Sequence, residues 1–244
     1  MLPVGCSADT SVLRVREITV LVTQRLYEIE ETDGRQSTGA PGRRWWRDEA
    51  KVVVEWLIAL AAVIVLLPLF IAIALLVALS SGRPVIYRRR VVGHGGKELD
   101  AFKFRTMVQG AERVLEQDER LRELFTKNWK LFADPRVTGV GRLLRKYSLD
   151  ELPQLVNVLR GEMALIGPRM VSPQELQRYG QLQSTLWSVR PGLTGLWQVS
   201  GRQTVSYATR IELDMFYISN CTLRFDLSIL ARTLPVVVRA EGAF

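Results

Sequence analysis

Two adjacent carboxylates, Asp150 and Glu151, are the side chains of this sequence best suited to catalysis. They stand five residues after Arg145, and Ser148 precedes them at a position typical of a helix N-cap. Acidic residues also favour the first turn of an ordinary helix, so the stretch alone is compatible with a purely structural role. The neighbouring motifs must decide between the two interpretations.

Three loops punctuated by glycine or proline carry arginines downstream of this pair: Gly167-Pro168-Arg169, the 190–195 loop and Ser200-Gly201-Arg202. Residues 103–107 add further cations upstream. Arginine on a tight loop can grip phosphate oxygens with two parallel hydrogen bonds, and glycine lets the backbone approach closely. One carboxylate could then act as a nucleophile in phosphoryl transfer while the other holds a divalent metal. Each loop alone is also typical of a structural turn.

A run of twenty-four apolar residues, 56–79, contains one proline, Pro68. Proline removes a backbone donor and clashes with the preceding turn, so we expect a kink or break near Leu67. The two halves have twelve and eleven residues. At 1.5 Å per residue each is roughly 17–18 Å long, about half of the ~30 Å hydrocarbon core of a bilayer. The run therefore predicts either one bent span or a re-entrant hairpin.

Basic residues flank the apolar run on both sides. Short segments rich in Lys and Arg remain on the cytoplasmic side, which favours a hairpin that enters and leaves by the same face. Proline is also common in spanning helices, so these residues alone leave a kinked single-span anchor open. The flanking cations are Arg43, Arg44, Arg47 and Lys51 before the run, and Arg83, Arg88, Arg89 and Arg90 after it.

The composition fits one globular domain with a membrane attachment. A length of 244 residues with 48% hydrophobic residues can fill one core. A net charge of +8 and a pI near 9.9 indicate an anionic partner, such as lipid headgroups, a phosphorylated substrate or nucleic acid. The sequence has no recognisable nucleic-acid-binding motif. Cys6 and Cys221 form no metal or disulfide spacing, and no secretory signal peptide is apparent.

The periodicity predicts an α+β fold that is mostly helical. A small β-hairpin is expected within residues 85–107, around Gly93-His94-Gly95-Gly96. Residues 31–42 are typical of a linker. Helical spacing recurs downstream over residues 111–131, 142–159 with an interruption at Pro153, 207–218, and 223–238 with a break near Pro235.

Taken together, five motifs resemble the bacterial sugar transferase family, the monotopic polyprenyl-phosphate phosphoglycosyl transferases. The similarity runs from about Lys51 to the C-terminus, and residues 1–47 lie outside it. The stretch 206–210 and the short ending are most similar to the exopolysaccharide-initiating undecaprenyl-phosphate galactose phosphotransferases. The motifs are Lys103-Phe104-Arg105-Thr106-Met107, Asp134-Pro135-Arg136-Val137-Thr138, Ser148-Leu149-Asp150-Glu151-Leu152-Pro153-Gln154-Leu155, Gly167-Pro168-Arg169 and Arg190-Pro191-Gly192-Leu193-Thr194-Gly195-Leu196-Trp197-Gln198-Val199-Ser200-Gly201-Arg202.

The resemblance implies transfer of a sugar 1-phosphate, galactose or glucose first, from a UDP-sugar to undecaprenyl phosphate, with release of UMP. It implies that Asp150 attacks the sugar-bearing phosphate to form a covalent intermediate and that Glu151 coordinates Mg²⁺. Residues implied in substrate binding are Lys103, Arg105, Arg145, Arg169, Arg190, Pro191 and Gly192. The sugar and the oligomeric state, including a homo-oligomer, are left open.

The resemblance also implies an organisation: an N-terminal extension and linker (1–47), a re-entrant membrane helix–break–helix centred on Pro68 (48–82), and a transferase domain with interfacial amphipathic helices (83–244). Because UDP-sugars are cytoplasmic and the lipid phosphate lies in the membrane, we expect the domain on the cytoplasmic face of the bacterial inner membrane, among membrane lipids. This expectation favours the hairpin over the single span.

Three positions depart from the family pattern. Leu67 stands where serine usually precedes the proline, so no hydroxyl can satisfy a freed carbonyl there. Met170 replaces a frequent proline after Gly-Pro-Arg, and Ala164 a frequent serine. The competing hypothesis is a non-enzymatic membrane-anchored protein whose basic surface binds nucleic acid or anionic lipid. It explains the charge and the anchor but not the acidic pair among phosphate-type loops.

Overall fold

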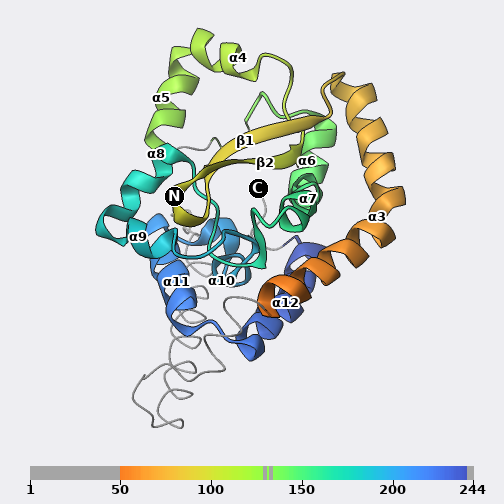
Figure 1. Cartoon of the computed structure of the whole chain (residues 1–244). Coiled ribbons are helices and arrows are strands. Elements are labelled where there is room, and N and C mark those ends of the chain that lie inside the picture. The colour runs from red at the N-terminus through yellow and green to blue at the C-terminus, as the bar shows by residue number, and fades with distance from the viewer. Residues whose placement is uncertain (1–49, 129–130, 132–133, 241–244) are drawn as a thin grey trace, which may run out of the picture.

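The computed structural model describes residues 50–128, 131 and 134–240. The predicted N-terminal extension and its linker therefore lie outside the described residues. The described part is mostly helical, with two small two-stranded sheets, which confirms the predicted α+β class. Figure 1 shows the helices arranged around the sheets, with one long helix wrapped around a side of the domain.

The long helix is α3 (Lys51–Ser81), which runs through Pro68 without ending there. Figure 1 shows it bent near its middle. Pro68 explains the bend, since it cannot donate to the preceding turn. The helix ends at Gly82, whose φ of 75° suits glycine and whose N–H donates to the Ala78 carbonyl at 3.0 Å. Among the described residues α3 is the one helix long and apolar enough to cross a membrane, and most of its apolar residues are exposed.

The predicted hairpin is present as strands β1 (Ile86–Val92) and β2 (Glu98–Phe104). The strands are antiparallel, with Val92 opposite Glu98 and Ile86 opposite Phe104. A short turn, η2 (His94–Gly96), joins them, and Gly95 and Gly96 have positive φ there. The hairpin places Lys103 near the end of β2.

The region between the hairpin and the acidic pair differs in detail from the prediction. The expected helix 111–131 is divided into α4 (Ala111–Gln117) and α5 (Glu119–Asn128), because Asp118 is extended between them. The expected helix 142–159 is α6 (Gly139–Lys146), η3 (Leu149–Glu151) and α7 (Gln154–Leu159). The predicted interruption at Pro153 is present, because Pro153 lies between η3 and α7, and a further interruption at Ser148, with φ of 54°, was not predicted.

The second sheet pairs two short parallel strands, β3 (Ala164–Ile166) and β4 (Gly192–Thr194). The backbones of the loops around this sheet approach each other so closely that only glycine fits at the contact points. A Cβ on Gly192 would lie 2.2 Å from the Gly167 nitrogen, and a Cβ on Gly195 would lie 2.1 Å from the Gly167 carbonyl oxygen. This sheet therefore holds the Gly-Pro-Arg loop directly against the Arg-Pro-Gly loop.

The C-terminal half supplies most of the remaining helices. α11 (Tyr207–Asn220) and α12 (Leu223–Val238) begin at Ser206 and Thr222, whose side chains cap them. The predicted break near Pro235 is wrong, because Pro235 lies in the last turn and α12 continues to Val238. The shorter elements are α8 (Pro173–Leu176), η4 (Gln177–Leu182), α9 (Gln183–Leu186), α10 (Leu196–Val199) and η5 (Arg202–Thr204).

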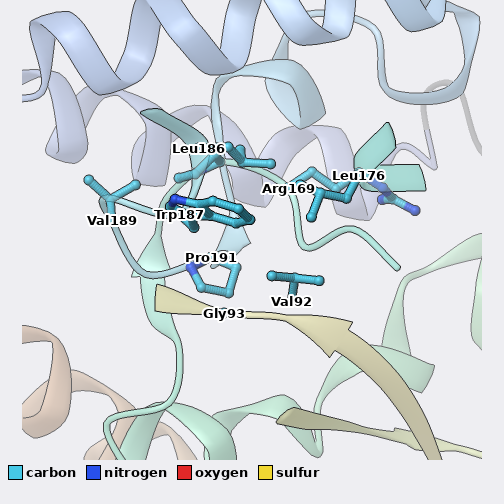
Figure 2. A pocket seen from close by; sticks show the side chains of 9 residues that line it. Val92, Gly93, Arg169, Leu176, Leu186, Trp187, Val189 and Pro191 are labelled. Carbon is cyan, nitrogen blue, oxygen red and sulfur yellow. The ribbon is translucent and has the colours of Figure 1, made fainter. Parts of the chain in front are cut away.

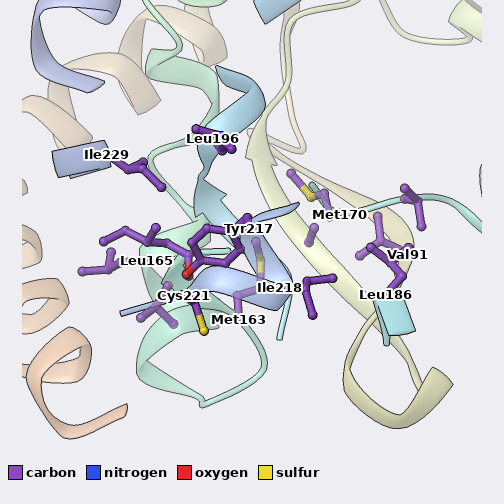
Figure 3. Packing of buried hydrophobic residues seen from close by; sticks show 14 of the residues in the cluster. Val91, Met163, Leu165, Met170, Leu186, Leu196, Tyr217, Ile218, Cys221 and Ile229 are labelled. Carbon is purple, nitrogen blue, oxygen red and sulfur yellow. The ribbon is translucent and has the colours of Figure 1, made fainter. Parts of the chain in front are cut away.

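The main core lies between β3, α11, α12 and the hairpin. Met163, Leu196 and Ile229 are almost fully buried there, and Figure 3 shows them with Leu165 and Tyr217. A smaller cluster forms where the second half of α3 meets the end of β2, with Ile73 and Val77 beside Phe104 and Leu144. The two clusters join the long helix to the domain at both of its halves.

Candidate active site

The acidic pair lies on the short helix η3 between α6 and α7. Asp150 is buried, whereas the Glu151 side chain keeps 24% of its exposure. Ser148 takes the predicted N-cap position, but its side chain makes no cap hydrogen bond. Its hydroxyl instead accepts a hydrogen bond from the Arg202 guanidinium. The stretch is thus more than an ordinary helix start.

Lys103 joins β2 to the acidic pair. Its Nζ lies 2.5 Å from Glu151 Oε1, and both side chains are largely buried. Burial raises the pKa of Asp150, and Glu151 adds to the rise, while Lys103 and Arg145 act against it. Burial would also raise the pKa of Glu151, but Lys103 and Arg169 outweigh it, so the pKa of Glu151 is lowered. The two neighbours therefore differ: Glu151 is the more readily ionised carboxyl.

Arg145 approaches the pair from α6. Its Nε donates to Thr106 Oγ1 at 2.9 Å, and its charge acts on Asp150. A close backbone contact fixes the start of this helix, because a Cβ on Gly141 would lie 2.1 Å from the Thr106 carbonyl oxygen. Arg136 and Asp134, from the Asp-Pro-Arg motif, form a two-pronged ion pair at 2.9 and 2.7 Å.

Arg169 lies on the loop after β3, and its charge acts on Glu151. Its backbone N–H donates to Asp214 Oδ1 at 3.2 Å, and its guanidinium carbon lies 4.5 Å from the centre of the Trp197 ring. Burial lowers the pKa of Arg169, and the nearby Arg89 and Arg210 lower it further. A cation held among cations favours an anionic ligand.

The 190–192 loop positions Arg169 without pairing with the acidic residues. The Gly192 N–H donates to the Pro168 carbonyl at 2.8 Å, and the Ala164 N–H donates to the Pro191 carbonyl at 2.9 Å. Pro191 and Gly192 are buried, and Arg190 is half-buried. A small, mostly apolar cavity lies beside Arg169, and Trp187, Leu176 and Pro191 line it (Figure 2).

Arg105 contacts the end of α3 rather than the acidic pair. Its Nη2 donates to the Ser81 carbonyl at 2.5 Å and also to the Gly82 carbonyl, at the end of α3. Cations are favourable at a helix C-terminus, because the last carbonyls lack partners. The contacts of Arg105 thus tie the long helix to β2.

Four charged residues around Arg169 were missed by the sequence analysis. Arg89, which the sequence analysis placed among the flanking charges, forms an ion pair with Glu175 at 2.8 Å. Asp214 accepts from Arg169 and from the Tyr179 hydroxyl, the latter at 2.9 Å. Burial raises the pKa of Asp214 to about 6. Arg210, the fourth residue, lies in α11. The presence of Arg210 in the 206–210 stretch was the one available signal for these residues.

The two carboxylates supply only part of the oxygen ligands that a hard cation such as Mg²⁺ requires. The described residues contain no group of three or more His, Cys, Asp and Glu side chains arranged to hold a metal. Mg²⁺, however, is usually held by one or two carboxylates together with substrate phosphates. Two adjacent carboxylates beside phosphate-type cations fit that kind of site once substrate phosphates complete it.

The fold and the site define a class of protein. A buried carboxylate pair faced by lysine and arginine, on a domain joined to a long exposed apolar helix, is suited to enzymes that act on phosphorylated substrates at a membrane. The sequence comparison agrees with this class. The profile of the bacterial sugar transferase family matches residues 46–240, and the chain belongs to that family.

Curated relatives place the chain near one branch of the family. It is 46% identical over 192 residues to the exopolysaccharide production protein ExoY of Sinorhizobium fredii, covering 77% of this chain and 85% of that protein. The ExoY protein of Rhizobium meliloti is 45% identical over 199 residues, covering 80% of this chain and 88% of that protein. The undecaprenyl-phosphate galactose phosphotransferase of Salmonella typhimurium is 47% identical over 167 residues, covering 67% of this chain and 35% of that longer protein.

These findings confirm the family, its exopolysaccharide-related branch and the expectation that the chain is a transferase enzyme. The family membership sets aside the hypothesis of a non-enzymatic anchored protein. The roles of individual residues stay predictions, which the geometry makes more specific.

Proposed function

We propose that the chain transfers a sugar 1-phosphate, galactose or glucose, from a UDP-sugar to undecaprenyl phosphate and releases UMP. The observation that carries the proposal is the buried Asp150 beside Glu151, with Lys103 on β2, Arg145 on α6 and Arg169 after β3 converging on the pair. The names of relatives support the substrates, since they include an undecaprenyl-phosphate galactose phosphotransferase and a UDP-glucose:undecaprenyl-phosphate glucose-1-phosphate transferase. The product would start an exopolysaccharide or other surface polysaccharide.

The proposed chemistry has two displacements at one phosphorus atom. Asp150 attacks the sugar-linked phosphorus, the bond to the bridging oxygen breaks, and UMP leaves with that oxygen. An oxygen of undecaprenyl phosphate then attacks the same phosphorus and releases the Asp150 carboxylate. Lys103 and Arg145 offset the charge that develops on the phosphoryl oxygens. Asp150 must be ionised to attack, and these two cations favour its ionised form against the effect of burial.

Glu151 would hold Mg²⁺ together with oxygens of the pyrophosphate. When bound, Mg²⁺ would neutralise charge on the pyrophosphate and so ease departure of UMP. Glu151 suits this role because its pKa is lowered and its side chain is the more exposed member of the pair. In the substrate-free enzyme Lys103 occupies its Oε1, and this contact would adjust as the metal enters.

The attachment of α3 supports the re-entrant arrangement. A straight helix of 31 residues would be about 46 Å long and would separate its ends by more than a bilayer core. Here both ends contact one domain: Lys51 pairs with Asp226 of α12, and Arg105 caps Ser81. Cysteines introduced at Arg47 and Arg83 in a chain without Cys6 and Cys221 should be labelled from the same, cytoplasmic face. Labelling from opposite faces would contradict the hairpin.

An assay with purified protein in detergent tests the proposal. With Mg²⁺, undecaprenyl phosphate and UDP-galactose or UDP-glucose labelled on the sugar-linked phosphate, we expect label in the lipid and one UMP per transfer. Without lipid, the wild type should retain label on the protein, and Asp150→Asn should not. Absence of label from the lipid with every UDP-sugar of a panel would refute the function. Full turnover by Asp150→Asn would refute the nucleophile.

A further inference from the structure

Several buried nitrogen donors around Trp197 have no hydrogen-bond acceptor. Among the described residues these are Nε of Arg169, Nε and Nη2 of Arg210, and Nε1 of Trp197 itself. Both guanidinium groups lie against the same indole ring, at 4.5 Å for Arg169 and 5.7 Å for Arg210. Leaving buried donors unpaired is costly, so an unfilled set of this kind needs an explanation.

The neighbouring carboxylates have their oxygens engaged elsewhere. Asp214 accepts from the Arg169 backbone and from Tyr179. Glu175 accepts from Arg89 and from the Ser172 backbone N–H. Both carboxylates attract Arg169 and Arg210 electrostatically. Neither carboxylate accepts a hydrogen bond from the unpaired side-chain nitrogens of these two arginines. The unfilled positions on Arg169, Arg210 and Trp197 are N–H donors, so they suit an anion with several acceptor oxygens, such as phosphate.

Stacking holds Arg210 in place beside this donor set. Its guanidinium carbon lies 4.0 Å from the centre of the Tyr207 ring, one helical turn away on α11. A stacked guanidinium loses little rotamer freedom when it binds, and its fork matches phosphate geometry. The site is therefore pre-organised for an anion.

The position of this donor set relative to the acidic pair indicates which phosphate it serves. After Lys103, the cation with the largest electrostatic effect on Asp150 is Arg145, whereas on Glu151 it is Arg169. Arg145 thus acts mainly on Asp150, and Arg169 acts mainly on Glu151. A pyrophosphate has two phosphates to match them: the attacked one beside Asp150 and the departing one on the side of Glu151.

We propose that Arg210, together with Arg169 and the Trp197 N–H, binds the nucleoside-linked phosphate of the nucleotide sugar, the group that departs as nucleoside monophosphate. The proposal rests on the proposed function and adds Arg210 and Trp197 as substrate-binding residues. Arg210 grips the phosphate through Nε and Nη2, and Trp197 adds one donor from the ring on which both arginines stack.

Equilibrium binding of UMP to the full chain in detergent tests the assignment without turnover. We expect Arg210→Met to weaken UMP binding at least tenfold, because it removes two hydrogen bonds to a charged group, and to leave uridine binding unchanged. Arg210→Lys should retain part of the affinity, and Trp197→Phe, which keeps the stacked ring, should lose less than Arg210→Met. The matched control is Arg113→Met, an exposed arginine of α4, which should bind UMP like the wild type.

The following results distinguish this inference from its alternatives and from a failure of the proposed function. If Arg210→Met binds UMP as tightly as the wild type, or loses uridine and UMP equally, the inference is overturned. A second arm with a short-chain prenyl phosphate distinguishes the other phosphate source: weakened prenyl phosphate binding with unchanged UMP binding would also overturn it. If the wild type itself neither binds UMP nor releases it from any UDP-sugar, the proposed function fails instead.

Discussion

Lys51 is the residue whose replacement tests how the first half of α3 is attached to the catalytic domain. Its Nζ lies 2.9 Å from Glu55 Oε1, 2.5 Å from Asp226 Oδ2 and 3.2 Å from the Tyr217 hydroxyl. All four residues are buried, with whole-residue exposures of 9% or less. Glu55 also accepts the Ile166 backbone N–H at 3.0 Å, which links the cluster to β3.

Lys51→Met should lower the free energy of unfolding by about 3–5 kcal/mol, the usual effect of removing one partner of a buried ion pair. Methionine keeps most of the side-chain volume, so little of this loss comes from a cavity. Two buried carboxylates, Glu55 and Asp226, then face each other without the lysine. A triple variant that also carries Glu55→Gln and Asp226→Asn should recover most of the loss, since it buries no charge.

Chemical denaturation in detergent, followed by circular dichroism, measures these differences. Arg224→Met, at an exposed position of α12, is the control and should remain within about 0.5 kcal/mol of the wild type. The reasoning would be refuted by a Lys51→Met variant within about 1 kcal/mol of the wild type, or by a triple variant less stable than Lys51→Met.

Three further predictions concern other parts of the domain. The pKa of Asp214 is raised to about 6, so the contribution of Asp214 to the free energy of unfolding should be fully present below about pH 4 and be lost, by roughly 3 kcal/mol, as pH rises through about 6. Unfolding of Asp214→Asn should lack this decline, and an identical pH profile would contradict the assignment. Gly192→Ala should abolish folding or transfer, because its Cβ would lie 2.2 Å from the backbone nitrogen of Gly167. Gly139→Ala should be tolerated, because a Cβ there meets open space. If the two variants had comparable melting temperatures, the close approach at Gly192 would be ruled out as the cause. Arg105→Met should lower the melting temperature and leave the KM for the UDP-sugar within twofold of the wild type, since Arg105 caps α3. A tenfold higher KM at an unchanged melting temperature would instead support Arg105 as a substrate-binding residue.

The elements that sequence could predict are those whose local signals agree with tertiary packing. The hairpin combines β-leaning strands with a turn at Gly95 and Gly96, and the long helix is a continuous run of apolar helix formers. The interruption at Pro153 was predicted, whereas the additional one at Ser148 was missed, because Ser148 adopts positive φ through tertiary contacts. The sheet of β3 and β4 was missed, since three-residue parallel strands have no periodicity to detect.

The residues of the candidate site likewise fall into those that a local sequence signal identifies and those that only tertiary packing brings to the site. Asp150, Glu151, Lys103, Arg145 and Arg169 were identified because each belongs to a recognisable motif. Arg89 and Arg210 were not, because on sequence alone one is a flanking charge and the other a polar residue of an amphipathic helix. Only tertiary packing makes them neighbours of Arg169: α8 pairs with Arg89 of β1, and Arg210 of α11 lies against the Trp197 ring.

The bend of α3 and the geometry of the acidic pair depend on the same residues. The first half of the helix contacts Ile166 through Glu55, three residues before Arg169. The second half packs Phe70 against Phe104 at 5.9 Å, and Arg105 caps its end, so both neighbours of Phe104 are engaged: Arg105 with the helix and Lys103 with Glu151. A straight α3 could keep only one of these two sets of contacts. The proline in the middle of the apolar run therefore helps to set where two of the cations, Lys103 and Arg169, stand around Asp150 and Glu151.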